Sequence, residues 1–256
     1  MSGSQMLYFK AWRESRTRFL ISAAVIATFC VVVVLFSGSI QAHADDLPVG
    51  LRVTQYNAHV YHFIYSGTLK GIFAMLVIFL GLGGLLRERQ RGTAWFTLGL
   101  PVTRNELIAS QVSVGLVQVV ALALLPVLLV PTLSPLVHQS YPVRDSLHFA
   151  VLWCAGGTLE FAMAFLWSVV VAGEYTALVA AFLVLFGIPL VAQVRVLEPY
   201  QVNILQTMGE FGTMQWNMDH TLLVPPALSQ IRLTIFALIA VGMIATALRI
   251  TQRQDL

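Results

Sequence analysis

Two charged side chains, Lys70 and Glu160, lie inside long apolar segments of the sequence. Charges at such positions are costly in a membrane and commonly serve substrate contact, ion transfer or mutual pairing. Glycines recur at helical spacing beside both charges, at positions 67 and 71 and at positions 156 and 157. This spacing predicts that each charge faces a closely packed neighbouring helix rather than lipid. Lys70 and Glu160 are therefore a candidate substrate path or ion relay; a structural ion pair or a snorkelling lysine is the alternative.

Other side chains that could do chemistry form sparser patterns. His59 and His62 stand three residues apart, and methionines at positions 208, 214 and 218 lie near His220. A zinc site needs three or four ligands, and methionine is a common filler of apolar gaps, so we expect no metal site. The sequence also lacks the phosphate-binding run G-x-x-x-x-G-K-[ST] and the motifs H-E-x-x-H and G-x-S-x-G. We therefore expect no catalytic residues and no ATP hydrolysis by this chain alone.

Six apolar segments are long enough to position these charges within a bilayer, where one helix needs about 20 apolar residues. The composition is 57% hydrophobic and 11% charged, with a mean hydropathy of +0.78, whereas about a quarter of the residues in soluble domains are charged. The segments cover residues 19–40, 63–86, 107–137, 147–172, 175–194 and 231–248. The sequence therefore predicts an all-α polytopic membrane protein with six transmembrane helices, because strand-like alternation is absent.

The basic residues predict the orientation of these helices. With the N-terminus in the cytoplasm, ten lysines and arginines fall on the inner side and four on the outer side, which satisfies the positive-inside rule. The inner group is Lys10, Arg13, Arg16, Arg18, Arg87, Arg89, Arg91, Arg104, Arg249 and Arg253. The net charge of +3 is thus a topology signal, and we expect no nucleic-acid partner. Both termini should face the cytoplasm.

Residues 1–256 form a single predicted transmembrane domain with three special segments. Residues 5–18 are amphipathic and predict an interfacial helix along the inner leaflet. Residues 198–230 are polar but rich in apolar side chains, which predicts short helices that dip into the outer leaflet. Residues 87–104 form a short basic loop between the second and third spans. This loop carries Trp95 and Phe96, whose exposed rings need a headgroup layer or a groove on a partner protein to cover them.

The loop pattern Glu88-x-x-x-Gly92-Thr93, followed by Leu100-Pro101-Val102-Thr103-Arg104, resembles the coupling-helix region of type-2 ABC exporter permeases. The motif covers about seventeen residues, and the six expected spans extend the similarity along the chain. The resemblance implies a separate cytoplasmic ATPase subunit, present in two copies, that binds ATP and Mg and docks on this loop. It also implies a second permease subunit, identical or related, in a bacterial inner membrane. The implied docking residues are Glu88, Gly92, Thr93, Trp95, Phe96 and Arg104.

The resemblance further implies that closure of the ATPases moves the docked loops and opens a path between two permease subunits, with residues 198–230 as an exit gate. Two other functions remain open. An ion-coupled secondary transporter would use Lys70 and Glu160 as its relay, and a membrane scaffold or sensor would recruit a partner through the same loop without transporting anything. The substrate itself leaves no signature in the sequence.

Overall fold

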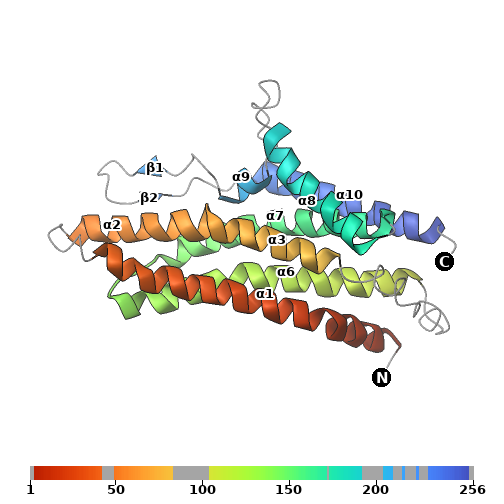
Figure 1. Cartoon of the computed structure of the whole chain (residues 1–256), viewed down its shortest axis with the longest axis horizontal. Coiled ribbons are helices and arrows are strands. Elements are labelled where there is room, and N and C mark those ends of the chain that lie inside the picture. Colours follow the sequence, from red (N-terminus) through yellow and green to blue (C-terminus); the bar gives the residue numbers. More distant parts are fainter. Residues whose placement is uncertain are drawn as a thin grey trace.

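The computed structural model describes residues 3–41, 49–82, 104–171, 173–191, 204–209, 215–216, 223–224 and 230–253. Within these ranges the chain is almost entirely helical, which confirms the predicted helical class (Figure 1). The α-helices are α1 (Gly3–Gln41), α2 (Val49–Val60), α3 (Thr68–Gly81), α6 (Arg104–Leu133), α7 (Val143–Val170), α8 (Glu174–Val191), α9 (Ile204–Gly209) and α10 (Gln230–Arg253). A π-helical turn, Tyr61–Tyr65, follows α2, and a 3-10 turn, Ser134–Val137, follows α6. Two short strands, β1 (Gln215–Trp216) and β2 (Leu223–Val224), pair antiparallel.

Five helical segments of the described chain are long and apolar enough to cross a membrane: Gln5–Ser37, Gln55–Gly81, Asn105–Val137, Val143–Val170 and Gln230–Gln252. The remaining predicted span, residues 175–194, corresponds to α8. This helix has 18 residues, and its apolar described part, Tyr175–Gly187, is shorter than the other five segments. A helix of this length lies at the lower limit for crossing a bilayer core. The chain is therefore a helical membrane protein, with five described helices that clearly meet the length requirement.

Helix α7 forms the centre of the bundle. It contacts α3, α6, α8, α9 and α10, and 72% of its membrane-length window is buried, against 11% for α10. Its buried large side chains include Phe149, Trp153 and Phe161. On the other side of the bundle α1 packs along α6 (Figure 1). Any residue on the inner face of α7 is consequently shielded from lipid by several neighbouring helices.

Helix α1 differs from the expectation of a separate interfacial helix at residues 5–18. These residues continue into the first span without interruption, and α1 is 39 residues long, which corresponds to about 58 Å at the usual helical rise. No glycine or proline stands between Ser4 and Ser37 to break the helix. Leu7 and Ala11 are buried, so one face of the first turns packs against the bundle, while Tyr8, Phe9 and Trp12 are exposed.

Four helix ends lie close together at one end of the bundle, which we call the terminal end. The beginnings of α1 and α6 and the ends of α3 and α10 all lie there (Figure 1). Two hydrogen bonds tie these segments together: Gln252 Nε2 donates to Asn105 Oδ1 at 2.8 Å, and Arg18 Nη1 donates to the Phe79 carbonyl oxygen at 2.9 Å. Both termini of the described chain therefore lie at the same end as the two helix ends that flank residues 83–103.

The opposite end of the bundle is held by a buried hydrogen-bond chain. Ser134 Oγ donates to the Val130 carbonyl oxygen at 2.7 Å, so its remaining bond, at 2.6 Å to the Tyr56 hydroxyl, has Tyr56 as donor. Helix α6 runs through Pro126 and Pro131 and ends at Leu133, two residues before Pro135. The helical segment nevertheless continues through the 3-10 turn to Val137, the predicted end of the third span.

Candidate functional site: a buried lysine and glutamate beside a helix break

The second span is interrupted in its middle. The π-helical turn Tyr61–Tyr65 is followed by Ser66 and Gly67, which belong to no helix, before α3 begins at Thr68. A Cβ atom at Gly67 would overlap the carbonyl oxygen of His62, so the chain can only turn this tightly with glycine there. Ser66 supplies hydrogen bonds to a backbone carbonyl next to the interruption. Its amide and its hydroxyl both donate to the Tyr61 carbonyl oxygen, at 2.9 and 3.2 Å. Non-helical backbone inside a membrane span is tolerated only where protein or a polar cavity surrounds it.

Lys70 lies in the first turn of α3, three residues after this break. Its side chain is only 8% exposed, and Glu160, in the central helix α7, is completely buried. The prediction from glycine spacing, that both charges face packed helices rather than lipid, is confirmed by this burial. The helix break and the central position of α7 together place a cation and an anion inside the same bundle.

The two charges interact electrostatically across the contact between α3 and α7. No ion pair within 4.0 Å joins Lys70 and Glu160, however, and neither carboxylate oxygen of Glu160 accepts a hydrogen bond from the protein. A buried carboxylate normally has its lone pairs occupied, because leaving them empty costs free energy. The arrangement can therefore take up a proton or accept hydrogen bonds from a bound group, while Lys70 offsets the charge.

Close packing surrounds Glu160 on the α7 surface. A Cβ atom at Gly157 would lie 2.9 Å from a methyl carbon of Val119 and 3.0 Å from the ring of Phe73. A Cβ atom at Gly156, one turn before Glu160, would overlap the side chain of Met208 in α9. The glycines therefore allow α3, α6 and α9 to pack closely against α7. Helix α9 belongs to residues 198–230, so part of this segment reaches the face of α7 that carries Glu160.

Aromatic side chains close the site towards the end of the bundle opposite the terminal end. The ring of Phe73 lies 4.8 Å from that of Trp153, and the ring of Tyr65 stacks on Phe149 at 4.6 Å. Tyr65 also donates a hydrogen bond to Ser146 Oγ at 3.0 Å. The Trp153 indole nitrogen is buried and has no hydrogen-bond partner. Bulky rings thus seal the charged pair on this side, while the nitrogen of Trp153 remains available as a donor.

The predicted docking residues Glu88, Gly92, Thr93, Trp95 and Phe96 lie outside the described residues. For Arg104 the backbone is described, as the first residue of α6. The helix break was not predicted, although the adjacent pair Ser66-Gly67 is a signal that could have marked it. Among the described residues, no three histidine, cysteine, aspartate or glutamate side chains come together to hold a metal ion.

Comparison with known proteins identifies no family for this chain. No family model matches the chain, and neither a curated protein nor a solved structure matches it. The function must therefore be argued from the residues and geometry of this chain.

Proposed function

We propose that this chain is the membrane-spanning permease subunit of an ABC exporter. A separate cytoplasmic ATPase, in two copies, docks on residues 87–104 and binds the ATP and Mg that drive transport. A second permease subunit, identical or related, completes the path, and the complex belongs to a bacterial inner membrane. The proposal joins the loop motif, which contains Trp95 and Phe96, to a helical membrane protein whose sequence carries no ATPase motif of its own.

The observation that carries the proposal is the arrangement of the terminal end. The end of α3 and the beginning of α6, which flank the loop, lie there together with both termini (Figure 1). The positive-inside rule favours the cytoplasm for this end, because Lys10, Arg13, Arg16 and Arg18 near the start of α1 and Arg249 near the end of α10 lie there. A cytoplasmic ATPase would then reach the loop directly and push on two helices at once.

The proposed mechanism transmits this movement through α3 to the charged site. Helix α3 ends at Gly81, close to the docking loop, and begins at Thr68 beside Lys70. The break at Ser66 and Gly67 gives α3 a hinge, so α3 could tilt without carrying α2 with it. Tilting α3 would change the separation of Lys70 from Glu160 on α7, which is the step that exposes or closes the substrate path.

Co-purification of the full chain from its native membranes tests the proposal. We expect a P-loop ATPase to accompany the wild-type chain, and Trp95→Ala or Glu88→Ala to lower its recovery at least tenfold. A central aromatic anchor contributes about 2 kcal/mol or more to an interface, and about 1.4 kcal/mol corresponds to tenfold in affinity. Quantitative mass spectrometry of the purified complex measures the ratio of ATPase to this chain.

Trp12→Ala is the matched control. Trp12 is also an exposed tryptophan near the terminal end, but it lies on α1 rather than in the loop. We expect Trp12→Ala to leave ATPase recovery unchanged. If no ATP-binding protein accompanies the wild-type chain, or if Trp95→Ala and Trp12→Ala behave alike, the permease proposal is wrong.

A second candidate function, ion-coupled secondary transport, is favoured by the helix break beside buried charges. Broken helices and buried acidic residues commonly form the coupling-ion site of such transporters, and here the break lies beside Lys70, which faces Glu160. Export by intact cells distinguishes the two functions. An ion-coupled transporter continues to export without any ATPase partner and stops when an ionophore dissipates the proton gradient, whereas the proposed permease stops only when the ATPase is removed.

A further inference from the structure

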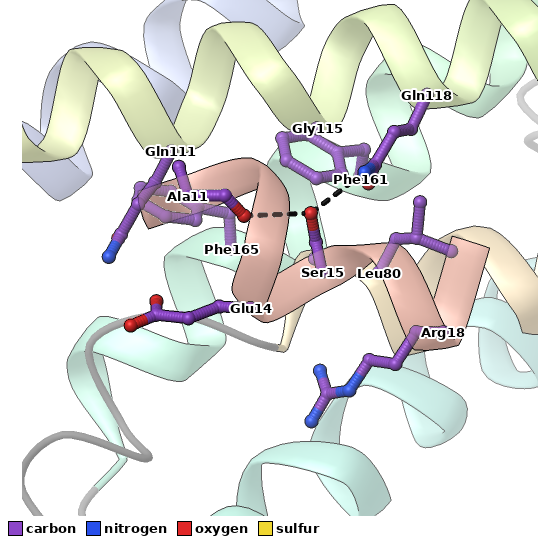
Figure 2. A pocket seen from close by; sticks show the side chains of 11 residues that line it. Ala11, Glu14, Ser15, Arg18, Leu80, Gln111, Gly115, Gln118, Phe161 and Phe165 are labelled. Atoms are coloured by element: carbon purple, nitrogen blue, oxygen red, sulfur yellow. Dashed lines mark hydrogen bonds between the residues drawn. The ribbon is translucent and has the colours of Figure 1, made fainter. Parts of the chain in front are cut away.

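A small polar cavity lies between α1, α3, α6 and α7 at the terminal end of the bundle (Figure 2). Its volume is about 40 Å³. A cavity needs about 10–15 Å³ by this measure to hold one water molecule, so a group of ammonium size fits. Its polar lining consists of Glu14, Ser15, Arg18, Gln111 and Gln118.

The cavity is lined by two buried side-chain oxygen atoms that accept no hydrogen bond from the described residues. Ser15 Oγ donates to the Ala11 carbonyl oxygen at 2.9 Å and accepts from Gln118 Nε2 at 2.7 Å (Figure 2). This bond leaves Gln118 Oε1 without a partner, although the side chain is only 1% exposed. Gln111 Oε1 is buried and without a partner as well. Unfilled buried acceptors cost free energy, so the cavity is suited to a ligand that donates several hydrogen bonds.

The charges at the mouth of the cavity specify the ligand further. Glu14 lies at the rim with its side chain 43% exposed, and its carboxylate already pairs with Lys10 at 3.9 Å across the helix surface; a cationic ligand in the cavity would share this carboxylate with Lys10. Arg18 follows one helical turn later, where side chains four residues apart have Cβ atoms about 5–6 Å from each other. A carboxylate and a guanidinium at this separation match an ammonium and a phosphate joined by a short link.

A second cavity continues from Arg18 on its lipid-facing side. This groove is lined by Arg18 together with Ser22 and the mainly apolar side chains Ile21, Leu76, Phe79, Leu82, Tyr175 and Leu178. Its volume is about 490 Å³, which is large enough for part of an acyl chain. Arg18 lines both cavities and is held at their junction by its hydrogen bond to the Phe79 carbonyl oxygen.

We propose that the two cavities bind one phospholipid with a primary-ammonium headgroup from the leaflet next to the terminal end. The ammonium enters the polar cavity and donates to Gln118 Oε1, Gln111 Oε1 and the Glu14 carboxylate. The phosphate lies against Arg18, and an acyl chain follows the apolar groove between α1, α3 and α8. This lipid site is independent of the proposed ATPase and of the pair formed by Lys70 on α3 and Glu160 on α7.

Selective lipid retention tests this proposal on the full chain. The purified protein is incubated in nanodiscs with equal amounts of phosphatidylethanolamine and phosphatidylcholine, and retained lipid is counted by native mass spectrometry after transfer to mild detergent. Phosphatidylcholine has the same phosphate but a quaternary ammonium without N–H donors. We expect about a tenfold preference for phosphatidylethanolamine, and a loss of at least fivefold of that preference in Glu14→Gln and in Arg18→Gln.

Arg16→Gln is the matched control, because Arg16 is an exposed arginine of α1 that lines neither cavity. We expect it to retain the wild-type preference. Glu14→Gln alters an exposed rim residue and should fold normally even if Arg18→Gln does not. Equal retention of both lipids by the wild type would mean that the polar cavity holds only water. A preference that is lost in Arg18→Gln but kept in Glu14→Gln would equally overturn the assignment of an ammonium group.

Discussion

Lys70→Met should lower the free energy of unfolding by about 3–5 kcal/mol, because it leaves the buried Glu160 carboxylate without its counter-charge. Glu160 is completely buried, and among the described residues none donates a hydrogen bond to its carboxylate that would offset the loss. Glu160→Leu should lower the free energy of unfolding by a similar amount, since it leaves the largely buried ammonium of Lys70 without its counter-charge. Titration with SDS in mixed micelles measures the unfolding free energy of each variant.

The double variant Lys70→Met with Glu160→Leu should return to within about 1 kcal/mol of the wild type. Replacing a buried charge pair with apolar side chains of similar volume is commonly neutral or stabilising. Lys10→Met serves as the control, because Lys10 is the other lysine of the chain and its ion pair with Glu14, at 3.9 Å, lies at the surface; such pairs contribute at most about 1 kcal/mol. Strictly additive single effects would show that the two charges do not act as a pair.

The single and double variants also distinguish between a structural and a functional role for Lys70 and Glu160. If Lys70 and Glu160 only stabilise the bundle, the stable double variant should retain the function of the protein. If they line the substrate path or relay an ion, the same variant should fold and lose transport. Stability and function are thereby measured on one protein that lacks both charges but keeps the volume of the site.

The boundaries of the long helices follow closely from the sequence, whereas the helix break does not. Apolar runs located α6, α7 and α10 within a few residues, since membrane thickness dictates helix length. The π-helical turn at Tyr61–Tyr65 depends instead on tertiary packing, because Tyr65 must stack on Phe149 and reach Ser146 of another helix. A run of apolar residues contains no information on such a contact, so residues 63–86 were predicted as one continuous span.

The burial of Lys70 and Glu160 was predicted, but their interaction with each other was not, because it also depends on tertiary packing. Glycine spacing correctly indicated close packing beside Glu160, where Gly156 and Gly157 face neighbouring helices. Lys70 is buried as well, but a Cβ atom at Gly71 would meet nothing within 4 Å. Glycine spacing could not indicate that α3 would begin at Thr68 and so bring Lys70 into electrostatic contact with Glu160 across the interface with α7. The polar cavity was missed because its polar side chains come from α1 and α6, and are brought together only by helix packing.

Gly81→Ala should destabilise the protein by about 1–3 kcal/mol, the usual cost of inserting a methyl group into a closely packed core. A Cβ atom at Gly81 would lie 2.8 Å from the Ala164 methyl carbon and 2.9 Å from the Phe161 carbonyl oxygen. The carbonyl belongs to the backbone of α7 and cannot rotate away as a side chain could. The two helices must therefore separate, and the separation loosens the end of α3 that leads into the proposed docking loop.

Gly71→Ala provides a control on the same helix, ten residues earlier. A Cβ atom at Gly71 would meet nothing within 4 Å, so the substitution adds no clash. Alanine also favours a helix over glycine by up to about 1 kcal/mol. We expect Gly71→Ala to be neutral or stabilising in the SDS titration and Gly81→Ala to be clearly destabilising. If both variants unfold at the same SDS fraction, then α3 and α7 are not packed as closely at Gly81 as the distances to Ala164 and Phe161 require.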